Sequence, residues 1–333
     1  MAVEVDSAVE LEQLVDCAMV HKAETLRRFL ADAGIAKSGT KDVLKDRLRD
    51  YLQQDSKNAV ELTEYLNLIE GWGNQHVYLY TAASGLYPKW RNENYVKDLL
   101  KRNRVLSVLN KPRPVVLPPS PTLASIFWTP QRVRFIWNER REWFERRDDA
   151  DIEATEENLV FRAWQRKTAR GTLAFDWDLQ TGHAMLMIQR LPTGTQYSGI
   201  RDVMVKWLAP FVDLNAFEVV RVSTAIKSIL ESGEVRERRT RWETMAGGKA
   251  TFTSPAQHKD IRDDATLRKM EAAGSGAIQG SMGNMYWLPR DGATLKQEFH
   301  SLMHRKDQRV GIMGEKIEQE VRYVIGRIRA HSR

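Results

Sequence analysis

A chain of 333 residues with 42% hydrophobic and 29% charged residues has the composition of a globular protein and not of a disordered one. The 51 Lys and Arg exceed the 44 Asp and Glu, and the resulting formal charge of +7 favours an anionic partner, with nucleic acid as the leading candidate. The single cysteine, Cys17, excludes an intramolecular disulfide and a CxxC metal knuckle, while the acidic N-terminus and the lack of a long apolar run argue against export and membrane insertion. We therefore expect a cytoplasmic or nucleoid-associated protein, or a nuclear one in a eukaryote.

The first third of the chain is predicted to be mainly helical. Residues 7–53 carry apolar residues at helical spacing in three groups, which indicates three short helices. A further helix is expected over residues 58–71, and the alternating residues 75–83 predict a strand. A basic segment from Tyr95 to Arg113 then runs into five prolines within residues 112–121. Because proline cannot continue a helix, this stretch favours an extended connector, and we place the main domain boundary there.

The chain after the connector is predicted to be a sheet with helices. Val133, Phe135 and Trp137 alternate with Arg132 and Arg134, which indicates a strand with one buried and one basic face. Residues 171–192 predict a hairpin that turns at Gln180-Thr181-Gly182. Helices are expected over residues 199–208 and 214–230, covering one face of the sheet, and strands are expected over residues 234–244 and 249–255. A basic helix from about Gly314 to Ala330 ends the chain.

The sequence thus indicates an α+β protein with three parts. Residues 1–56 form a small helical module, residues 57–122 form a helical segment with the basic, proline-rich connector, and residues 123–333 form an α+β domain with a basic surface. The sheet of this last domain is expected to be mainly antiparallel and covered by helices.

Residues 26–48, "LRRFLADAGIAKSGTKDVLKDRL", resemble the SAP module, a small helix-turn-helix unit of DNA-associated proteins. Apolar residues at positions 26 and 30 match its first helix, Gly34-Ile35 closes that helix, "KSGTK" is the link, and Leu44 with Arg47-Leu48 match the second helix. The resemblance implies that this part of the chain contacts duplex DNA.

The residues themselves support a phosphate contact at the start of the second helix. Gly34 suits a left-handed helix C-cap, Thr40 suits an N-cap, and Gly39 allows close approach of the backbone. Free N–H groups at a helix N-terminus attract phosphate, and eight basic residues against four acidic ones lie between Lys22 and Arg49. The predicted DNA-binding residues are Arg27, Arg28, Lys37, Ser38, Gly39, Thr40, Lys41 and Lys45. Binding is expected to be weak and non-specific. The alternative is that "SGTK" only starts a solvated helix.

A second nucleic-acid surface is predicted on the larger domain, where arginines alternate with Trp137, Trp143 and Trp242. Arginine beside aromatic residues suits a groove that follows a nucleic-acid backbone and stacks its bases. The residues of this second surface are Arg132, Arg134, Arg236, Arg238, Arg239 and Arg241. The alternative is an ordinary exposed sheet face beside core tryptophans.

A short stretch, "TEENLVFRAW" from Thr155 to Trp164, resembles part of the centromere protein N family. Members of that family join a small helical N-terminal module to a mixed α/β region and bind nucleosomes. The resemblance implies only that this order of domains is compatible with DNA-associated function.

Catalytic signals are sparse. Asp176 and Asp178 share one side of a predicted strand and could hold a divalent metal, but the next strand lacks a Glu-x-Lys pattern, so we interpret them as solvent-facing hairpin residues. His300 and His304 are four apart on an expected helix but have no third zinc ligand. The glycine-rich residues 274–285 lack the end of a P-loop and are interpreted as a flexible loop.

We therefore expect a non-enzymatic DNA-binding protein with no cofactor and no metal. Its expected partners are duplex DNA and other proteins of a DNA-associated complex. Two alternatives stay open: a metal-dependent nuclease subunit that would use Asp176 and Asp178, and a scaffold for protein assembly anchored by exposed tryptophans.

Overall fold

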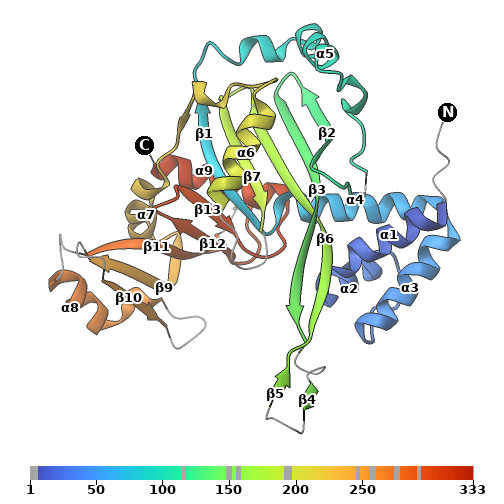
Figure 1. Ribbon diagram of the computed structural model, residues 1–333. Coiled ribbons are helices and arrows are strands. Elements are labelled where there is room, and N and C mark those ends of the chain that lie inside the picture. The colour runs from blue at the N-terminus through green and yellow to red at the C-terminus, as the bar shows by residue number, and fades with distance from the viewer. Residues whose placement is uncertain are drawn as a thin grey trace.

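The computed structural model describes residues 7–114, 117–147, 152–154, 159–190, 197–244, 248–254, 260–273, 278–290 and 294–332. Within these ranges helices and strands are mixed, as expected, and the strands form a large, mainly antiparallel sheet (Figure 1). No helix in this part of the chain is long and apolar enough to cross a membrane.

Four helices form the N-terminal part of the structure. They are α1 (Ser7–Met19), α2 (Ala23–Asp32), α3 (Lys41–Gln54) and α4 (Ser56–Trp72). The three short helices predicted before residue 53 are confirmed, and so is the helix that ends near Gly71. Leucines at helical spacing on α2, α3 and α4 share one core, to which Leu30, Leu44 and Leu66 belong. We call α1, α2 and α3 with their links the helical module.

The main sheet has eleven strands in the order β10-β9-β11-β12-β13-β1-β7-β6-β3-β2, with β8 also paired to β1. Its strands are β1 (Gln75–Ala82), β2 (Thr122–Thr129), β3 (Arg132–Arg146), β6 (Trp164–Asp178), β7 (His183–Gln189), β8 (Phe217–Val219), β9 (Val235–Thr244), β10 (Lys249–Thr253), β11 (Ile278–Trp287), β12 (Phe299–His304) and β13 (Arg309–Ile312). A separate pair contains β4 (Ile152–Ala154) and β5 (Leu159–Phe161). The remaining helices are α5 (Glu93–Arg102), α6 (Tyr197–Leu208), α7 (Val222–Glu231), α8 (Ala265–Ala273) and α9 (Glu318–His331).

The proline-rich connector does not separate two folding units. Strand β1 precedes the connector but lies between β13 and β7, both of which follow it in the chain. The expected boundary near residue 122 therefore joins two parts of one sheet. A local pattern shows that a chain is extended but not which strand it will pair with.

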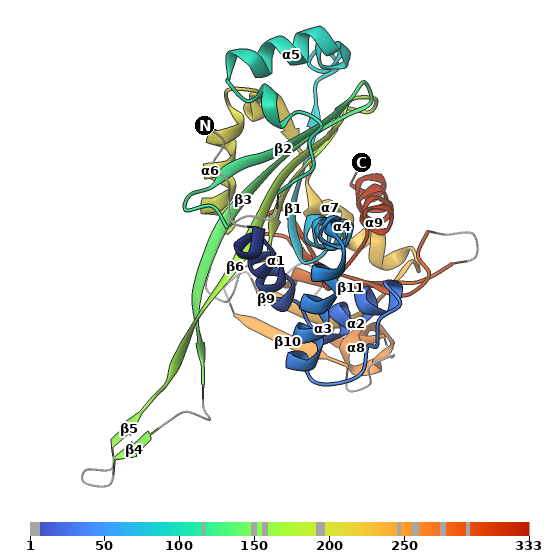
Figure 2. The ribbon, with the colours of Figure 1, turned by 90° about the vertical axis from the view of Figure 1, so that its right-hand side faces the viewer.

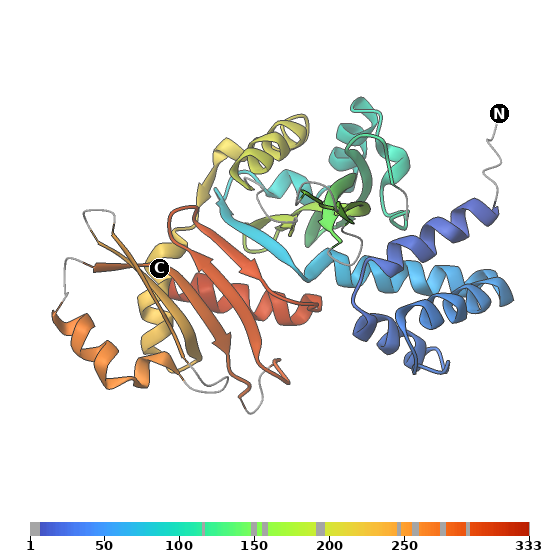
Figure 3. The ribbon, with the colours of Figure 1, turned by 60° about the horizontal axis from the view of Figure 1, so that its bottom comes forward.

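Helices cover both faces of the central strands, which corrects the expectation that they cover one face. On one face Tyr78, Phe135 and Trp177 pack under α5 and α6. On the other face Val77 and Met187 belong to a second core that includes α7 and α9 (Figure 3). Because both faces are buried, β1 and β7 are apolar at successive positions instead of alternating with polar residues.

Three local predictions were wrong. Residues 214–230 form a 3₁₀ turn, strand β8 and helix α7 instead of one helix, since β8 pairs with the edge of β1. His300 and His304 lie on strand β12 and not on a helix, because Phe299, Ser301 and Met303 are buried with a period of two. Residues 278–285 of the expected glycine-rich loop belong to strand β11, and residues 274–277 lie outside the described residues.

Strands β3 and β6 pair along their whole length, from Arg132 with Asp178 to Arg146 with Trp164. Their outer halves pair with no other described strand, since β2 pairs with β3 only as far as Asn138 and β7 pairs with β6 only from Leu173. This outer part projects from the sheet as a two-stranded ribbon, with β4 and β5 near its end (Figure 2). We call residues 139–147 and 163–171 the arm.

The stretch that resembles the centromere protein N family lies at the end of the ribbon. Residues 155–158 lie outside the described residues, residues 159–161 form β5, and Trp164 begins β6.

Candidate nucleic-acid interface

The link before α3 has the local geometry that its sequence predicts. Thr40 is the N-cap, and its hydroxyl oxygen accepts a hydrogen bond from the N–H of Val43 at 3.5 Å. Gly34 has φ +74° and Gly39 has φ +114°, conformations that favour glycine. Two arginines hold the link from the helices: Arg27 donates to the carbonyl of Gly39 at 3.1 Å, and Arg47 donates to the carbonyls of Ala36, at 2.7 Å, and Ser38.

The predicted phosphate-binding residues of this link are open to solvent. Lys37, Ser38, Gly39, Thr40 and Lys41 are all exposed. Within the described part of the chain neither lysine forms an ion pair. The N-terminal end of α3 therefore presents free backbone N–H groups flanked by two available ammonium groups, a combination suited to an anion.

Three residues of the predicted set have other roles. Arg27 holds the link through Gly39, as described above. Lys45 faces α1, where its ammonium lies 3.0 Å from Asp16 and 3.6 Å from Glu12. Arg28 lies away from the link and lines a cleft together with Glu315. The structure thus brings together only part of the predicted residues at the start of α3.

A groove runs between this end of the module and the arm. It is a cleft of about 660 Å³ lined by Lys41 and Lys45 from α3 and by Trp143, Arg166 and Lys167 from the arm. Burial and the neighbouring charge of Lys167 both lower the pKa of Lys41. Four basic side chains and two carboxylates, Asp16 and Glu145, line the groove, so the sum of its lining charges is positive. We call it the outer cleft.

Arg166 and Lys167 were not among the predicted binding residues. Each forms an ion pair within the arm: Arg166 pairs with Glu142, and Lys167 lies 3.5 Å from Glu145. The arm contains seven Lys and Arg against three Glu. The arginines of residues 139–147 indicated a basic strand in the sequence. Only the pairing of β3 with β6 shows that residues 163–171 belong to the same ribbon.

Arg132 and Arg134 do not lie on an open basic face, which corrects the expectation for this strand. Arg134 is 6% exposed, donates to the carbonyl of Gly71 at 2.8 Å and stacks 4.0 Å from the ring centre of Trp72. Arg132 pairs with Asp176 and with Glu318 of α9. The end of α4 and the start of α9 cover this face of β3.

The four predicted arginines of β9 are divided between different environments. Arg236 is buried beside Glu298, 2.5 Å away, and lies over the ring of Tyr286. Arg238 is half-buried, while Arg239 and Arg241 are exposed. Six strands separate β9 from β3 in the sheet, so these arginines and Arg132 cannot form one surface. The side chain of Trp242 lies outside the described residues.

The two candidate metal ligands have structural roles. Asp176 is 1% exposed, contrary to the solvent-facing interpretation, and pairs with Arg132 and Arg322. Burial by itself would raise its pKa, but the surrounding guanidinium groups lower it. Asp178 accepts hydrogen bonds from the N–H groups of Gln180 and Thr181 in the hairpin turn. In the described ranges no three His, Cys, Asp or Glu residues are grouped to hold a metal ion.

His300 and His304, the two candidate zinc ligands of the sequence, lie on strand β12. The ring of His300 stacks on Tyr286 with a centroid distance of 4.3 Å and lies 2.5 Å from the amide oxygen of Asn284. Burial lowers the pKa of both His300 and His304 to about 4, so both rings are neutral near pH 7.

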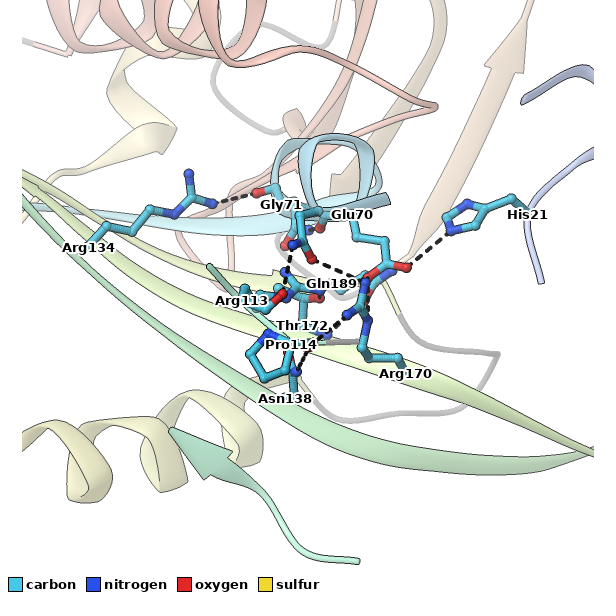
Figure 4. A network of polar contacts seen from close by, with 12 residues as sticks. His21, Glu70, Gly71, Arg113, Pro114, Arg134, Asn138, Arg170, Thr172 and Gln189 are labelled. Carbon is cyan, nitrogen blue, oxygen red and sulfur yellow. Dashed lines mark hydrogen bonds and ion pairs between the residues drawn. The ribbon is translucent and has the colours of Figure 1, made fainter. Parts of the chain in front are cut away.

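A buried polar network joins the module, α4, the connector and the base of the arm (Figure 4). The carboxylate of Glu70 on α4 forms ion pairs with Arg113, at an N···O distance of 2.7 Å, and with Arg170, at 2.8 Å. The Nε2 atom of His21 lies 3.3 Å from the same carboxylate. Burial would raise the pKa of Glu70, but the positive charge of Arg170, with His21 and Arg113, lowers it to about 2. The sequence alone did not predict this network because its members come from segments far apart in the chain, such as those that contain His21 and Arg170.

Cys17 lies near this network and is not a candidate nucleophile. It is a free cysteine, buried in the module core, and burial raises the pKa of its thiol to about 11. The thiolate, which is the reactive form, is therefore scarce near neutral pH.

No protein-family model matches this sequence, and no curated protein is significantly similar to it.

Proposed function

We propose that this chain is a non-enzymatic DNA-binding protein whose α3 N-terminus holds a duplex phosphate. The observation that carries the proposal is the exposed link of residues 37–41, where two lysines without ion pairs in the described structure flank a capped helix start. Backbone N–H groups and the helix dipole favour an anion there, and the lysines add long-range attraction. The resemblance of residues 26–48 to the SAP module supports the same site.

The arm extends this basic surface. Lys167 lies close enough to Lys41 for its charge to lower the pKa of Lys41, so a phosphate backbone passing the α3 N-terminus would also meet the arm. Contacts to phosphates fix position without reading sequence. We therefore propose binding with low sequence specificity and a strong dependence on salt.

The test is a titration of a labelled duplex across salt concentrations with the wild type and a Lys37→Gln, Lys41→Gln double variant. Each lost phosphate contact should reduce the slope of log K against log salt by about 0.9, so the expected change is about 1.8. At low salt we expect a loss of affinity of about tenfold or more.

The matched control is a Lys227→Gln, Lys306→Gln double variant, which removes the same charge from two exposed lysines on α7 and on the β12–β13 turn. The control should keep the wild-type slope. Equal slopes for the wild type and the Lys37, Lys41 variant would show that the α3 N-terminus is not the contact.

One observation favours a second candidate, a scaffold for protein assembly. Phe144 and Trp164 on the arm are 66% and 57% exposed, and aromatic side chains of this kind anchor protein interfaces. A wild-type chain that shows no salt-dependent duplex binding but forms a complex that a Phe144→Ser change abolishes would support this candidate.

A further inference from the structure

A second cleft lies on the other side of Trp143 from the outer cleft. It has a volume of about 500 Å³ and lies between the α1–α2 link, the base of the arm, the end of β7 and the turn after β13. It shares Cys17, Val20, Trp143 and Ala169 with the outer cleft, so the two clefts are neighbours with a common wall. We call it the inner cleft.

Basic side chains outnumber carboxylates in the lining of the inner cleft, where Glu24, Glu70 and Glu315 are the acidic residues. Lys22, Arg28 and Arg190 line it, and none of them forms an ion pair with a described residue. The nearby Glu70 does not balance them, because its carboxylate already receives Arg113 and Arg170. Three unpaired cations around one cleft favour an anionic ligand.

Arg141 gives an independent sign of a missing partner. Its side chain is 10% exposed, and its Nε and Nη1 atoms bind Glu139 at 2.5 Å and the carbonyl of Gln189 at 2.9 Å. The remaining Nη2 atom is buried and has no hydrogen-bond partner in the described structure. A buried guanidinium nitrogen without an acceptor is costly, and an anion in the cleft that Arg141 lines would supply one.

The other lining residues indicate what else the ligand carries. Trp143 is half-buried and lines the cleft, and no described aromatic ring stacks on it, so a planar base in the cleft would lie beside an indole ring. Glu24 and Glu315 supply carboxylates that can accept hydrogen bonds from sugar hydroxyls. A volume of about 500 Å³ is within the range of small-molecule sites.

We propose that the inner cleft binds one phosphorylated nucleoside, with its phosphate at Arg28, Arg141 and Arg190 and its base against Trp143. The unit could be a free mononucleotide or the 5′-terminal nucleotide of a single strand, since both present the same groups. This site does not depend on the proposed duplex contact at α3.

The test begins with calorimetric titration of adenosine 5′-monophosphate and of inorganic phosphate into the wild type. An Arg28→Gln, Arg190→Gln double variant should bind both at least tenfold more weakly, whereas a Trp143→Leu variant should lose affinity for the nucleotide only. Arg28 and Arg190 are exposed, so these changes should leave the melting temperature unaltered. The Lys227→Gln, Lys306→Gln variant is the charge-matched control.

Single-stranded 12-mers with and without a 5′-phosphate distinguish a free mononucleotide from the 5′-terminal nucleotide of a strand as the ligand. Tighter binding of the phosphorylated strand than of the free nucleotide would place the strand end in the cleft, and the reverse order would assign a free nucleotide. The proposal is overturned if neither probe binds the wild type at millimolar concentration, or if both cleft variants bind like the wild type. The Lys37→Gln, Lys41→Gln variant should retain nucleotide binding, so failure of the duplex proposal would be distinct from failure of this one.

Discussion

At the scale of single residues, the buried carboxylate of Glu70 organises the contact between the module and the sheet. Its negative charge balances the positive charges of two arginines from separate segments, Arg113 from the connector and Arg170 from the arm. Both guanidinium groups are buried, so neither can turn to water if the carboxylate is removed. A buried charge that loses its partner is strongly destabilising, whereas the intact pair contributes little by comparison.

We predict that Glu70→Gln lowers the free energy of unfolding by roughly 3–5 kcal/mol at pH 7, as measured by urea denaturation. The pKa of Glu70 is about 2 in the folded protein, below its ordinary value of 4.5. The stabilisation by the carboxylate is therefore fully present above pH 4.5 and is lost as the pH falls towards 2. The difference in the free energy of unfolding between the wild type and the variant should therefore decrease as the pH falls from 4.5 to 2.

The control for this change is Glu231→Gln, which alters an exposed glutamate paired with Lys227 at 3.8 Å. It should change stability by less than about 0.5 kcal/mol. Comparable losses for the two variants would contradict the role assigned to Glu70.

At the scale of elements, the link from α2 to α3 depends on two glycines in different ways. Gly34 ends α2 in a left-handed conformation, and the N–H of Ile35 bonds the carbonyl of Leu30 at 2.7 Å, as in a Schellman motif. A Cβ at Gly34 would meet no atom within 4 Å. A Cβ at Gly39 would lie 2.9 Å from Cγ1 of Val43, in addition to the strain of a φ of +114°.

We predict that Gly39→Ala destabilises the protein by roughly 2–3 kcal/mol and Gly34→Ala by about 1 kcal/mol. The order follows because Gly39 combines an unfavourable backbone angle with a steric contact, while Gly34 has only the first. Chemical denaturation of the two variants measures these losses in the free energy of unfolding. Equal losses would mean that the link relaxes around the new Cβ.

At the scale of the whole molecule, α4 belongs to two cores at once. Leu62 and Leu66 pack with the module, and Trp72 at the other end of the helix packs with the sheet. The same helix carries Glu70 between these two groups. The module and the sheet are therefore coupled by one rigid element, and the inner cleft lies at their junction.

We predict that the wild type unfolds in a single calorimetric transition and that a chain starting at Ser56 is unstable. Removing the three preceding helices would expose Leu62, Leu66 and Ile69, which are buried in the module core. Each fully buried leucine contributes about 1.5–3 kcal/mol through burial. A soluble truncated chain with the wild-type melting temperature would show instead that the sheet folds without the module.

Much of the local structure followed from the sequence, because it depends on neighbours in the chain. The helices of the module, the strand at residues 75–82 and the hairpin at Gly182 were predicted from periodicity and turn residues. The periodicity was ambiguous where few residues carried it. "EFHSLMH" suited a helix as well as a strand, and only pairing with β11 and β13 decided it.

The environment of charged residues could not be predicted in the same way. Arg134 and Arg166 are both arginines on strands, yet one is buried against Trp72 and the other is exposed on the arm. Their difference arises because the end of α4 and the start of α9 cover the part of β3 that carries Arg134, whereas Arg166 lies on the part of β6 that belongs to the arm.

By itself the sequence determined local features of the molecule: the helices of the module with α4, α6 and α9, about half of the strands, the capped start of α3, and a basic, globular composition. Those features depend on backbone geometry and on residues within a few positions of each other. Only the tertiary structure decided that β1 joins the strands after the connector, that Asp176 is enclosed by arginines, and that Lys41 and Arg190 line two neighbouring clefts that share Trp143. These depend on contacts between distant segments, whose free energy comes from burial that no local pattern specifies.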